Sequence, residues 1–175
     1  TVVVTRARAQ ASDLAAALDL MGARVIQLPV IRIEPLVGSP ALDAALADIG
    51  AHDIVIFTSA NGVEQMAARM TERGLDARSL RADQTIVAVG TATSAALASH
   101  GIRADVVPER FVGEAVLDAL ASTAVEGRRV LIARAADARP VIADGLRARG
   151  ATVSDVAVYA TIAERPADDV IEAAL

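Results

Sequence analysis

An internal repeat limits the folds open to this chain. Residues 2–33 align with residues 130–161 without a gap, at a shift of 128 positions. In each copy an apolar segment ends in an arginine (Arg6 or Arg134), and an amphipathic stretch then closes on a glycine (Gly22 or Gly150) before a second apolar segment. This order is typical of a strand, a helix and a second strand. The repeat therefore predicts two related α/β units with a ligand cleft between them.

The same alternation of strand and helix patterns runs along the whole chain and predicts an α/β fold with parallel strands. Strands are expected at residues 1–5, 24–28, 30–34, 53–57, 85–89, 104–107, 129–133 and 152–161. Helices are expected at residues 9–21, 41–48, 60–71, 91–100, 112–123, 137–149 and 167–175. Four glycines stand where helices should end, at Gly22, Gly74, Gly101 and Gly150.

Two linkers divide the chain. Residues 34–40 and 164–167 are rich in turn formers, and they bracket a continuous segment with expected strands near residues 53, 85, 104, 129 and 152. That segment is sufficient for a five-stranded sheet. Residues 1–30 supply only two strands and one helix, which cannot cover their own edges. We therefore expect the first unit to be incomplete, with its missing strands following the helix at 167–175.

Composition excludes several classes of function. The 175 residues include no cysteine and no lysine, which removes thiolate ligands, Schiff-base chemistry and the Walker lysine, and two histidines 48 residues apart are a poor start for a metal site. A net charge of −5 with 2% aromatic residues does not favour nucleic acid. The absence of a long apolar run or a basic leader predicts a cytoplasmic protein that does not bind a membrane.

Two strands end in small polar residues, where ligands of open α/β sheets bind. The first is followed by Thr58, Ser59 and Asn61, and the second by Gly90, Thr91 and Thr93. These residues could present backbone N–H groups and hydroxyls to a carboxylate or phosphate. Ordinary helix capping explains the same residues equally well. Neither segment has the spacing of a dinucleotide fingerprint or a P-loop, so a nucleotide cofactor is disfavoured.

Three further side chains are candidates for chemistry. Arg6 and Arg134 hold equivalent positions in the repeat, so each should face the predicted cleft from its own unit, although an exposed surface arginine is the alternative for either. Tyr159 is the single tyrosine and lies on an apolar strand. It is either a buried residue whose hydroxyl is satisfied or a phenol that donates a proton to a leaving oxygen. His52 and His100 lie away from these loops, and no catalytic role is expected for them.

With these segments in place, the chain resembles the uroporphyrinogen-III synthase family over all 175 residues. The resemblance is carried by the order and spacing of short motifs. These are Val4-Thr5-Arg6, Gly22-Ala23-Arg24-Val25, Phe57-Thr58-Ser59-Ala60-Asn61-Gly62-Val63, Ala88-Val89-Gly90-Thr91-Ala92-Thr93, Val107-Pro108 and Val158-Tyr159-Ala160-Thr161.

The resemblance implies a particular domain organisation. Two similar three-layer α/β domains with parallel sheets would be joined by a two-stranded ladder at residues 30–35 and 157–163. The first domain would be discontinuous, combining residues 1–33 with 164–175, and incomplete at its C-terminus. The second would be inserted as residues 38–158.

The resemblance also implies a reaction. Members of the family are lyases of tetrapyrrole biosynthesis (heme, siroheme, cobalamin) that cyclise hydroxymethylbilane to uroporphyrinogen III, inverting the last pyrrole ring and losing water, without cofactor or metal and commonly as monomers. Tyr159 matches the family's tyrosine, expected to assist departure of the hydroxyl group. Expected substrate-binding residues are Thr5, Arg6, Thr58, Ser59, Ala60, Asn61, Gly90, Thr91, Thr93, Arg134 and Arg139. The alternative is a non-enzymatic, hinged two-domain binding protein for a small anionic metabolite or sugar.

Overall fold

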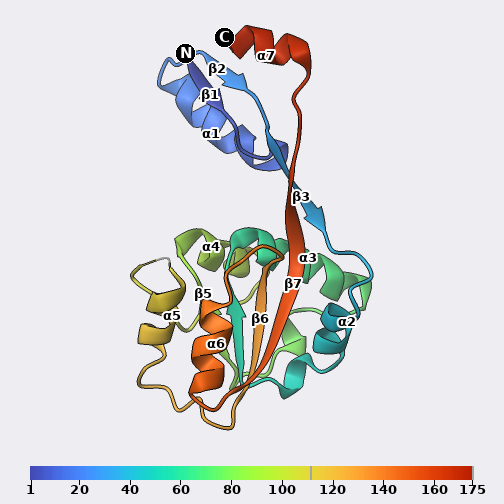
Figure 1. Cartoon of the computed structure of the whole chain (residues 1–175), viewed down its shortest axis with the longest axis vertical. Helices are drawn as coiled ribbons and strands as arrows, with labels where there is room; N and C mark the ends of the chain where they lie inside the picture. Colours follow the sequence, from blue (N-terminus) through green and yellow to red (C-terminus); the bar gives the residue numbers. More distant parts are fainter. Residues whose placement is uncertain (111, 175) are drawn as a thin grey trace. The chain divides into compact units, whose positions relative to one another are not determined.

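The chain forms two compact units, each built from strands and helices in alternation (Figure 1). A computed structural model describes residues 1–110 and 112–174. Unit 1 comprises Thr1–Glu34 and Thr161–Leu175, and unit 2 comprises the continuous segment Pro35–Ala160. The predicted α/β fold class is confirmed.

Unit 1 holds a small parallel sheet. Its strands are β1 (Val2–Val4) and β2 (Val25–Gln27), which pair with Val2 opposite Val25. The connecting helix α1 (Arg8–Leu20) contacts both strands, and α7 (Asp168–Ala174) contacts β2. The connection through α1 agrees with the rule that parallel strands require a crossover, usually a helix.

Unit 2 holds most of a larger sheet, of which β3 and the end of β7 continue into the segments of unit 1. The strands in the chain's five-stranded sheet stand in the order β3-β7-β6-β4-β5, and β4, β5, β6 and β7 pair in parallel. Their bounds are β3 (Ile31–Pro35), β4 (Ile54–Phe57), β5 (Thr85–Ala88), β6 (Arg129–Ala135) and β7 (Thr152–Ala163). The helices are α2 (Pro40–Ala47), α3 (Ala60–Glu72), α4 (Thr91–Ser99), α5 (Gly113–Ala119) and α6 (Val141–Ala148). Short 3₁₀ turns lie after α2, at η1 (Ile49–Ala51), and after α3, at η2 (Ala77–Ser79).

The inner strand β4 is buried on both faces of this sheet. Successive side chains of a strand point to opposite faces, so its residues pack alternately on the two sides. Ile54 and Ile56 of β4 belong to a core cluster with residues of α5 and α6, whereas the intervening Val55 and the following Phe57 are equally buried on the other side. There α3 packs against α4 and β6. Helices on both faces explain why these strands read as continuous apolar runs.

The two copies of the repeat fold in the same register. Val2 pairs with Val25 in the first copy, and Val130 pairs with Val153 in the second, which are the positions related by the shift of 128. Both helices end on a glycine with positive φ, +81° at Gly22 and +84° at Gly150. The repeat therefore encodes one strand–helix–strand unit twice. Gly74 and Gly101 also have positive φ after α3 and α4, as the sequence predicted.

One predicted strand is absent as a strand. Residues 104–107 form a single bridge, between Val106 and Val87, so the fifth strand of the sheet is β3 instead. The reason is Asp105, whose carboxylate accepts a hydrogen bond from the Ile86 backbone N–H at 2.8 Å. This side chain thereby takes the acceptor position that a backbone carbonyl would fill in a regular strand. Pro108, three residues later, has no backbone N–H to extend the pairing.

Two helices are shorter than predicted. The helix expected at 137–149 begins only at Val141, since Pro140 is its N-cap and a proline disfavours helical geometry at the preceding residue. The helix expected at 112–123 ends at Ala119. Beyond it the backbone turns through i to i+3 hydrogen bonds, from Ala121 to Asp118 and from Thr123 to Leu120.

Candidate functional site

The strand order of unit 2 places a topological switch point between β4 and β6. From β4 the chain continues to β5 on one side, while β6 on the other side continues to β7. In open parallel sheets the connections then lie on opposite faces, and a crevice opens outside the carboxyl ends of the two strands. The residues at this edge are those after Phe57 and those around Arg134.

Two predicted site residues that lie 100 positions apart meet here. Ser59 is the N-cap of α3, and its Oγ is 3.0 Å from the hydroxyl oxygen of Tyr159 on β7. The same Oγ accepts a hydrogen bond from the Gly62 backbone N–H at 3.0 Å. Tyr159 is 6% exposed, and Ser59 is half-buried. The helix cap and the tyrosine thus form one hydrogen-bonded cluster.

Close packing of α3 on the sheet makes this contact possible. A Cβ on Gly62 would stand 3.3 Å from Ser59 Oγ and 3.5 Å from the Ala133 carbonyl oxygen. Glycine therefore allows the first turn of α3 to approach β6. Thr58 completes the attachment, since both its backbone N–H and its hydroxyl donate to the Ala133 carbonyl at 3.2 Å. Ala60 and Asn61 are half-buried in the same first turn.

In the second predicted loop, after β5, one threonine is exposed and the other is buried. Gly90 is the N-cap of α4 with φ +99°, and Thr91 is exposed at the first helical position. Thr93 is 2% exposed, and its hydroxyl donates to the Val89 carbonyl at 2.9 Å. Thr91 is therefore the threonine that this loop presents to solvent.

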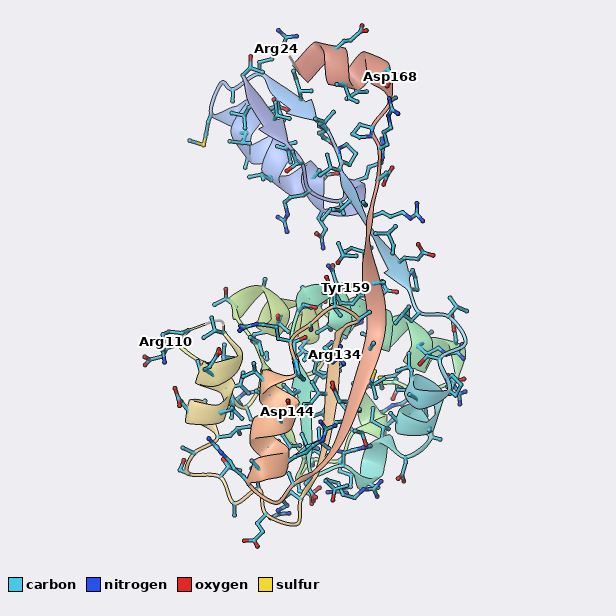
Figure 2. The ribbon with its side chains drawn as sticks, in the orientation of Figure 1. Arg24, Arg110, Arg134, Asp144, Tyr159 and Asp168 are labelled. Atoms are coloured by element: carbon cyan, nitrogen blue, oxygen red, sulfur yellow. The ribbon has the colours of Figure 1, made fainter. Side chains whose placement is uncertain are left out.

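Arg134 is held in place by its own unit. Its Nε donates to Asp155 Oδ1 at 2.6 Å and its Nη2 to Asp155 Oδ2 at 3.1 Å, while Nη1 donates to the carbonyls of Ala135 and Ala136. This pairing raises the pKa of Arg134 above its usual value. Figure 2 shows Arg134 and Tyr159 in unit 2, on the neighbouring strands β6 and β7. Ala136, whose carbonyl accepts from Arg134, in turn donates its N–H to the Tyr159 carbonyl at 2.8 Å. Arg134 thereby fixes the loop beside the tyrosine.

The remaining predicted residues lie at the surface. Thr5 and Arg6 are exposed directly after β1 in unit 1. Arg139 was expected at the start of a helix but lies in the loop before α6, where it is exposed and 3.8 Å from Glu114. Both residues of unit 1 keep the position at the carboxyl end of a strand that the sequence predicted.

Two positions important to this geometry were not predicted as site residues. The sequence predicts Gly62 only as a member of a motif, and it predicts Asp155 only as a residue of a strand. A glycine inside an otherwise regular helix signals close backbone approach. An acid within the apolar strand 152–161 signals a buried partner of opposite charge. Each signal was present in the sequence.

Among the residues that the structure describes, no three His, Cys, Asp or Glu side chains gather where they could hold a metal ion. Over the same part of the chain, no helix has the length and apolar character required to cross a membrane.

An α/β fold with polar residues at the switch point of its parallel sheet is the arrangement in which open α/β proteins bind small molecules. Comparison with known families makes this class specific. The sequence model of the family described as uroporphyrinogen-III synthase HemD matches residues 12–175. The chain belongs to this family.

Relatives from other organisms carry the same family name. The chain is 34% identical over 160 residues to uroporphyrinogen-III synthase of Synechococcus elongatus, covering 91% of this chain and 60% of the relative. It is 29% identical over 158 residues to a putative uroporphyrinogen-III synthase of Methanothermobacter thermautotrophicus, covering 90% of this chain and 61% of the relative. The chain thus spans about three fifths of the length of these relatives.

Solved structures share the fold. A mutant uroporphyrinogen III synthase from Thermus thermophilus matches 93% of this chain and 62% of its own with a TM-score of 0.67 at 18% identity. Uroporphyrinogen-III synthetase from Helicobacter pylori matches 86% of this chain and 62% of its own with a TM-score of 0.52 at 19% identity.

Proposed function

We propose that the protein converts hydroxymethylbilane to uroporphyrinogen III. Family membership supports this proposal, and the observation that carries it in this chain is the contact between Ser59 and Tyr159 at the switch point of the sheet. The family's tyrosine and the polar loop after β4 are distant in sequence. They meet at the edge where open α/β sheets bind ligands.

The proposed reaction asks for one acid and for control of geometry. Tyr159 donates a proton to the hydroxyl group of the substrate's hydroxymethyl carbon, which leaves as water and gives an azafulvenium cation. The terminal pyrrole attacks through its substituted carbon, and the resulting spiro intermediate fragments and closes again with that ring inverted. Holding the reacting carbons in this orientation is the larger catalytic task, because closure in solution leaves the ring uninverted.

Binding of a polyanionic substrate by a protein of net charge −5 requires local donors. In unit 2 we assign this role to backbone N–H groups in the first turns of α3 and α4, at Ala60, Asn61 and Thr91, where the positive ends of the helix dipoles favour carboxylates. In unit 1 we assign it to Thr5 and Arg6, which are exposed at the end of β1. Arg139, exposed in the loop before α6, is a further candidate. For Arg134, the hydrogen bonds to Asp155 support a role in fixing the loop after β6.

One assay tests the proposal. The full-length protein is given hydroxymethylbilane, and the type I and type III porphyrins are separated after oxidation. We expect type III as the main product. Type I alone, formed at the spontaneous rate, would refute the synthase activity and favour the hinged binding protein predicted as the alternative.

The role of Tyr159 is tested by Tyr159→Phe. Removing the phenol proton should lower kcat for type III by roughly 10²-fold, the range in which a single general acid acts. The fold should persist, since the ring is retained and only one hydrogen bond is lost, worth about 1 kcal/mol. An unchanged kcat would remove the proposed acid. Circular dichroism and thermal unfolding provide the control for folding.

A further inference from the structure

The hydroxyl group of Ser59 has two protein partners, and counting its hydrogen-bonding capacity restricts what each can do. A serine hydroxyl carries one hydrogen and two acceptor lone pairs. The Gly62 N–H occupies one lone pair at 3.0 Å. The contact with Tyr159 at 3.0 Å then uses either the second lone pair or the hydrogen.

The two arrangements differ in where the phenol proton points. If Tyr159 donates, its only proton is directed at Ser59 and is unavailable to a ligand. If Ser59 donates, the phenol oxygen is the acceptor and its proton is free to point elsewhere. The positive field at the N-terminus of α3, a helix of 13 residues, favours Ser59 Oγ with its lone pairs toward the helix and its hydrogen away from it.

We propose that Ser59 is a positioning residue that donates its hydrogen bond to Tyr159 and so directs the phenol proton toward the leaving hydroxyl group of the substrate. This inference rests on the proposed function. When the carbon–oxygen bond of the hydroxymethyl group breaks, its electron pair leaves with the oxygen, and the phenol proton completes a molecule of water. The Ser59 hydrogen bond then stabilises the phenolate. When the ring closes, the pyrrole carbon that forms the new bond loses its proton to the phenolate, so Tyr159 is restored and the net change is the loss of one water.

Position 62 supports this arrangement in two ways: its backbone N–H orients Ser59, and the absence of a Cβ leaves space for Ser59 beside Tyr159. A Cβ at this position would stand 3.3 Å from Ser59 Oγ, which is tight enough that Ser59 would have to shift. The backbone at Tyr159 is also fixed, since Ala136 N–H donates to the Tyr159 carbonyl at 2.8 Å. The tyrosine is therefore oriented through its hydroxyl group and through its backbone.

Capping and proton orientation can be separated with three substitutions of Ser59. Ser59→Thr keeps both the cap and the donor. Ser59→Asp keeps an acceptor for the Gly62 N–H but has no hydrogen to donate when ionised. Ser59→Ala loses both. Because Ser39 caps α2 by accepting from Leu42 N–H at 3.3 Å, Ser39→Ala is a matched control that loses a cap without touching Tyr159.

The variants are assayed for kcat and KM of type III formation, with and without Tyr159→Phe in the same chain. We expect Ser59→Thr to keep kcat within about twofold, and Ser59→Asp and Ser59→Ala to lower it by roughly tenfold or more, a part of the effect of one general acid. Ser59→Asp should keep the melting temperature and raise KM through its negative charge. Ser39→Ala should lower the melting temperature and leave kcat unchanged. Combined with Tyr159→Phe, the Ser59 substitutions should lower kcat no further.

Two sets of outcomes would overturn the inference and are distinguishable. A wild-type kcat for Ser59→Asp, or an equal loss with and without Tyr159→Phe, would overturn the role of Ser59 alone. A Tyr159→Phe protein as fast as the wild type, or formation of type I only, would overturn the proposed acid or the proposed function together with this inference.

Discussion

At the scale of single residues, the two arginines of the repeat have different environments because their partners differ. Arg134 pairs with Asp155, which stands opposite Ile132 in the register of β6 and β7. The corresponding position in the first copy is Gln27, opposite Val4. Arg6 consequently lacks the acid that its counterpart has at this place and stays exposed. The difference between Gln27 and Asp155 therefore leaves Arg134 in an ion pair and Arg6 exposed as a candidate substrate-binding residue.

Replacing each arginine by glutamine tests this difference. Arg134→Gln should destabilise the protein by roughly 1–3 kcal/mol, because Asp155, 12% exposed, is left without its charged partner. Arg6→Gln should change stability by less than about 0.5 kcal/mol, as expected of an exposed site, and should raise KM if Arg6 binds a carboxylate. Urea unfolding and steady-state kinetics measure both. Equal stability losses would contradict the assignment.

His52 makes the stability of unit 2 sensitive to acid. It is 2% exposed, with Nε2 3.3 Å from Ser154 Oγ, and burial, followed by the charge of Arg129, lowers its pKa below the usual value. The unfolded chain, with a histidine pKa of about 6.5, therefore binds the proton first as the pH falls. The contribution of the neutral ring is complete above about pH 6.5 and is lost as the pH falls through the lower pKa of the folded state.

Thermal or urea unfolding between pH 8 and 5 should show this loss (roughly the range around a histidine pKa). His52→Gln should flatten the pH dependence in this range, even if its stability at neutral pH is lower. His100→Gln removes the other histidine, at an exposed position beside Glu64, and is the matched control. The same slope in wild type and His52→Gln would show that another group titrates.

At the scale of elements, the repeated helix ends offer a direct comparison. Gly22 and Gly150 end α1 and α6 with nearly the same φ, but their surroundings differ. A Cβ at Gly22 would meet nothing within 4 Å, whereas at Gly150 it would stand 3.0 Å from Glu126 Cγ and 3.5 Å from Glu126 Cα. The same substitution should therefore cost more in the second copy.

Gly22→Ala should destabilise its unit by about 1–2 kcal/mol, the cost of a left-handed conformation for an L-residue. Gly150→Ala should cost this amount and, in addition, the displacement of Glu126. Hydrogen exchange of amides in β2 and β7 would assign each effect to its element. Equal costs at the two glycines would show that Glu126 moves aside freely.

Most helices and strands could be predicted from the sequence, because long apolar runs and glycine caps act on the local backbone. The prediction of a strand at 104–107 was wrong because the Asp105 side chain takes the place of a backbone acceptor. The periodicity of apolar residues carries no information about such a side-chain hydrogen bond. The site was readable only in part. Ser59 and Tyr159 were each predicted, but their contact depends on the strand order β7-β6-β4, which neither local sequence contains. The ion pair of Arg134 depends on strand register in the same way.

At the scale of the whole molecule, unit 2 holds a complete core. The cluster formed by β4, β6, α5 and α6 lies entirely between residues 35 and 160. A fragment of residues 35–160 should therefore unfold in one cooperative thermal transition. Ile132→Ala should cost the fragment and the full chain the same, roughly 2–5 kcal/mol. A fragment without a cooperative transition, or one indifferent to Ile132→Ala, would contradict this expectation.

The order of the units along the chain has a consequence for synthesis on the ribosome. Unit 1 is made of two segments, Thr1–Glu34 and Thr161–Leu175, whereas unit 2 is one continuous segment between them. The first strand–helix–strand copy is translated early but must wait for its second segment. The other copy, β6-α6-β7, closes unit 2 as it is translated. The domain that begins last is therefore the first that can finish folding.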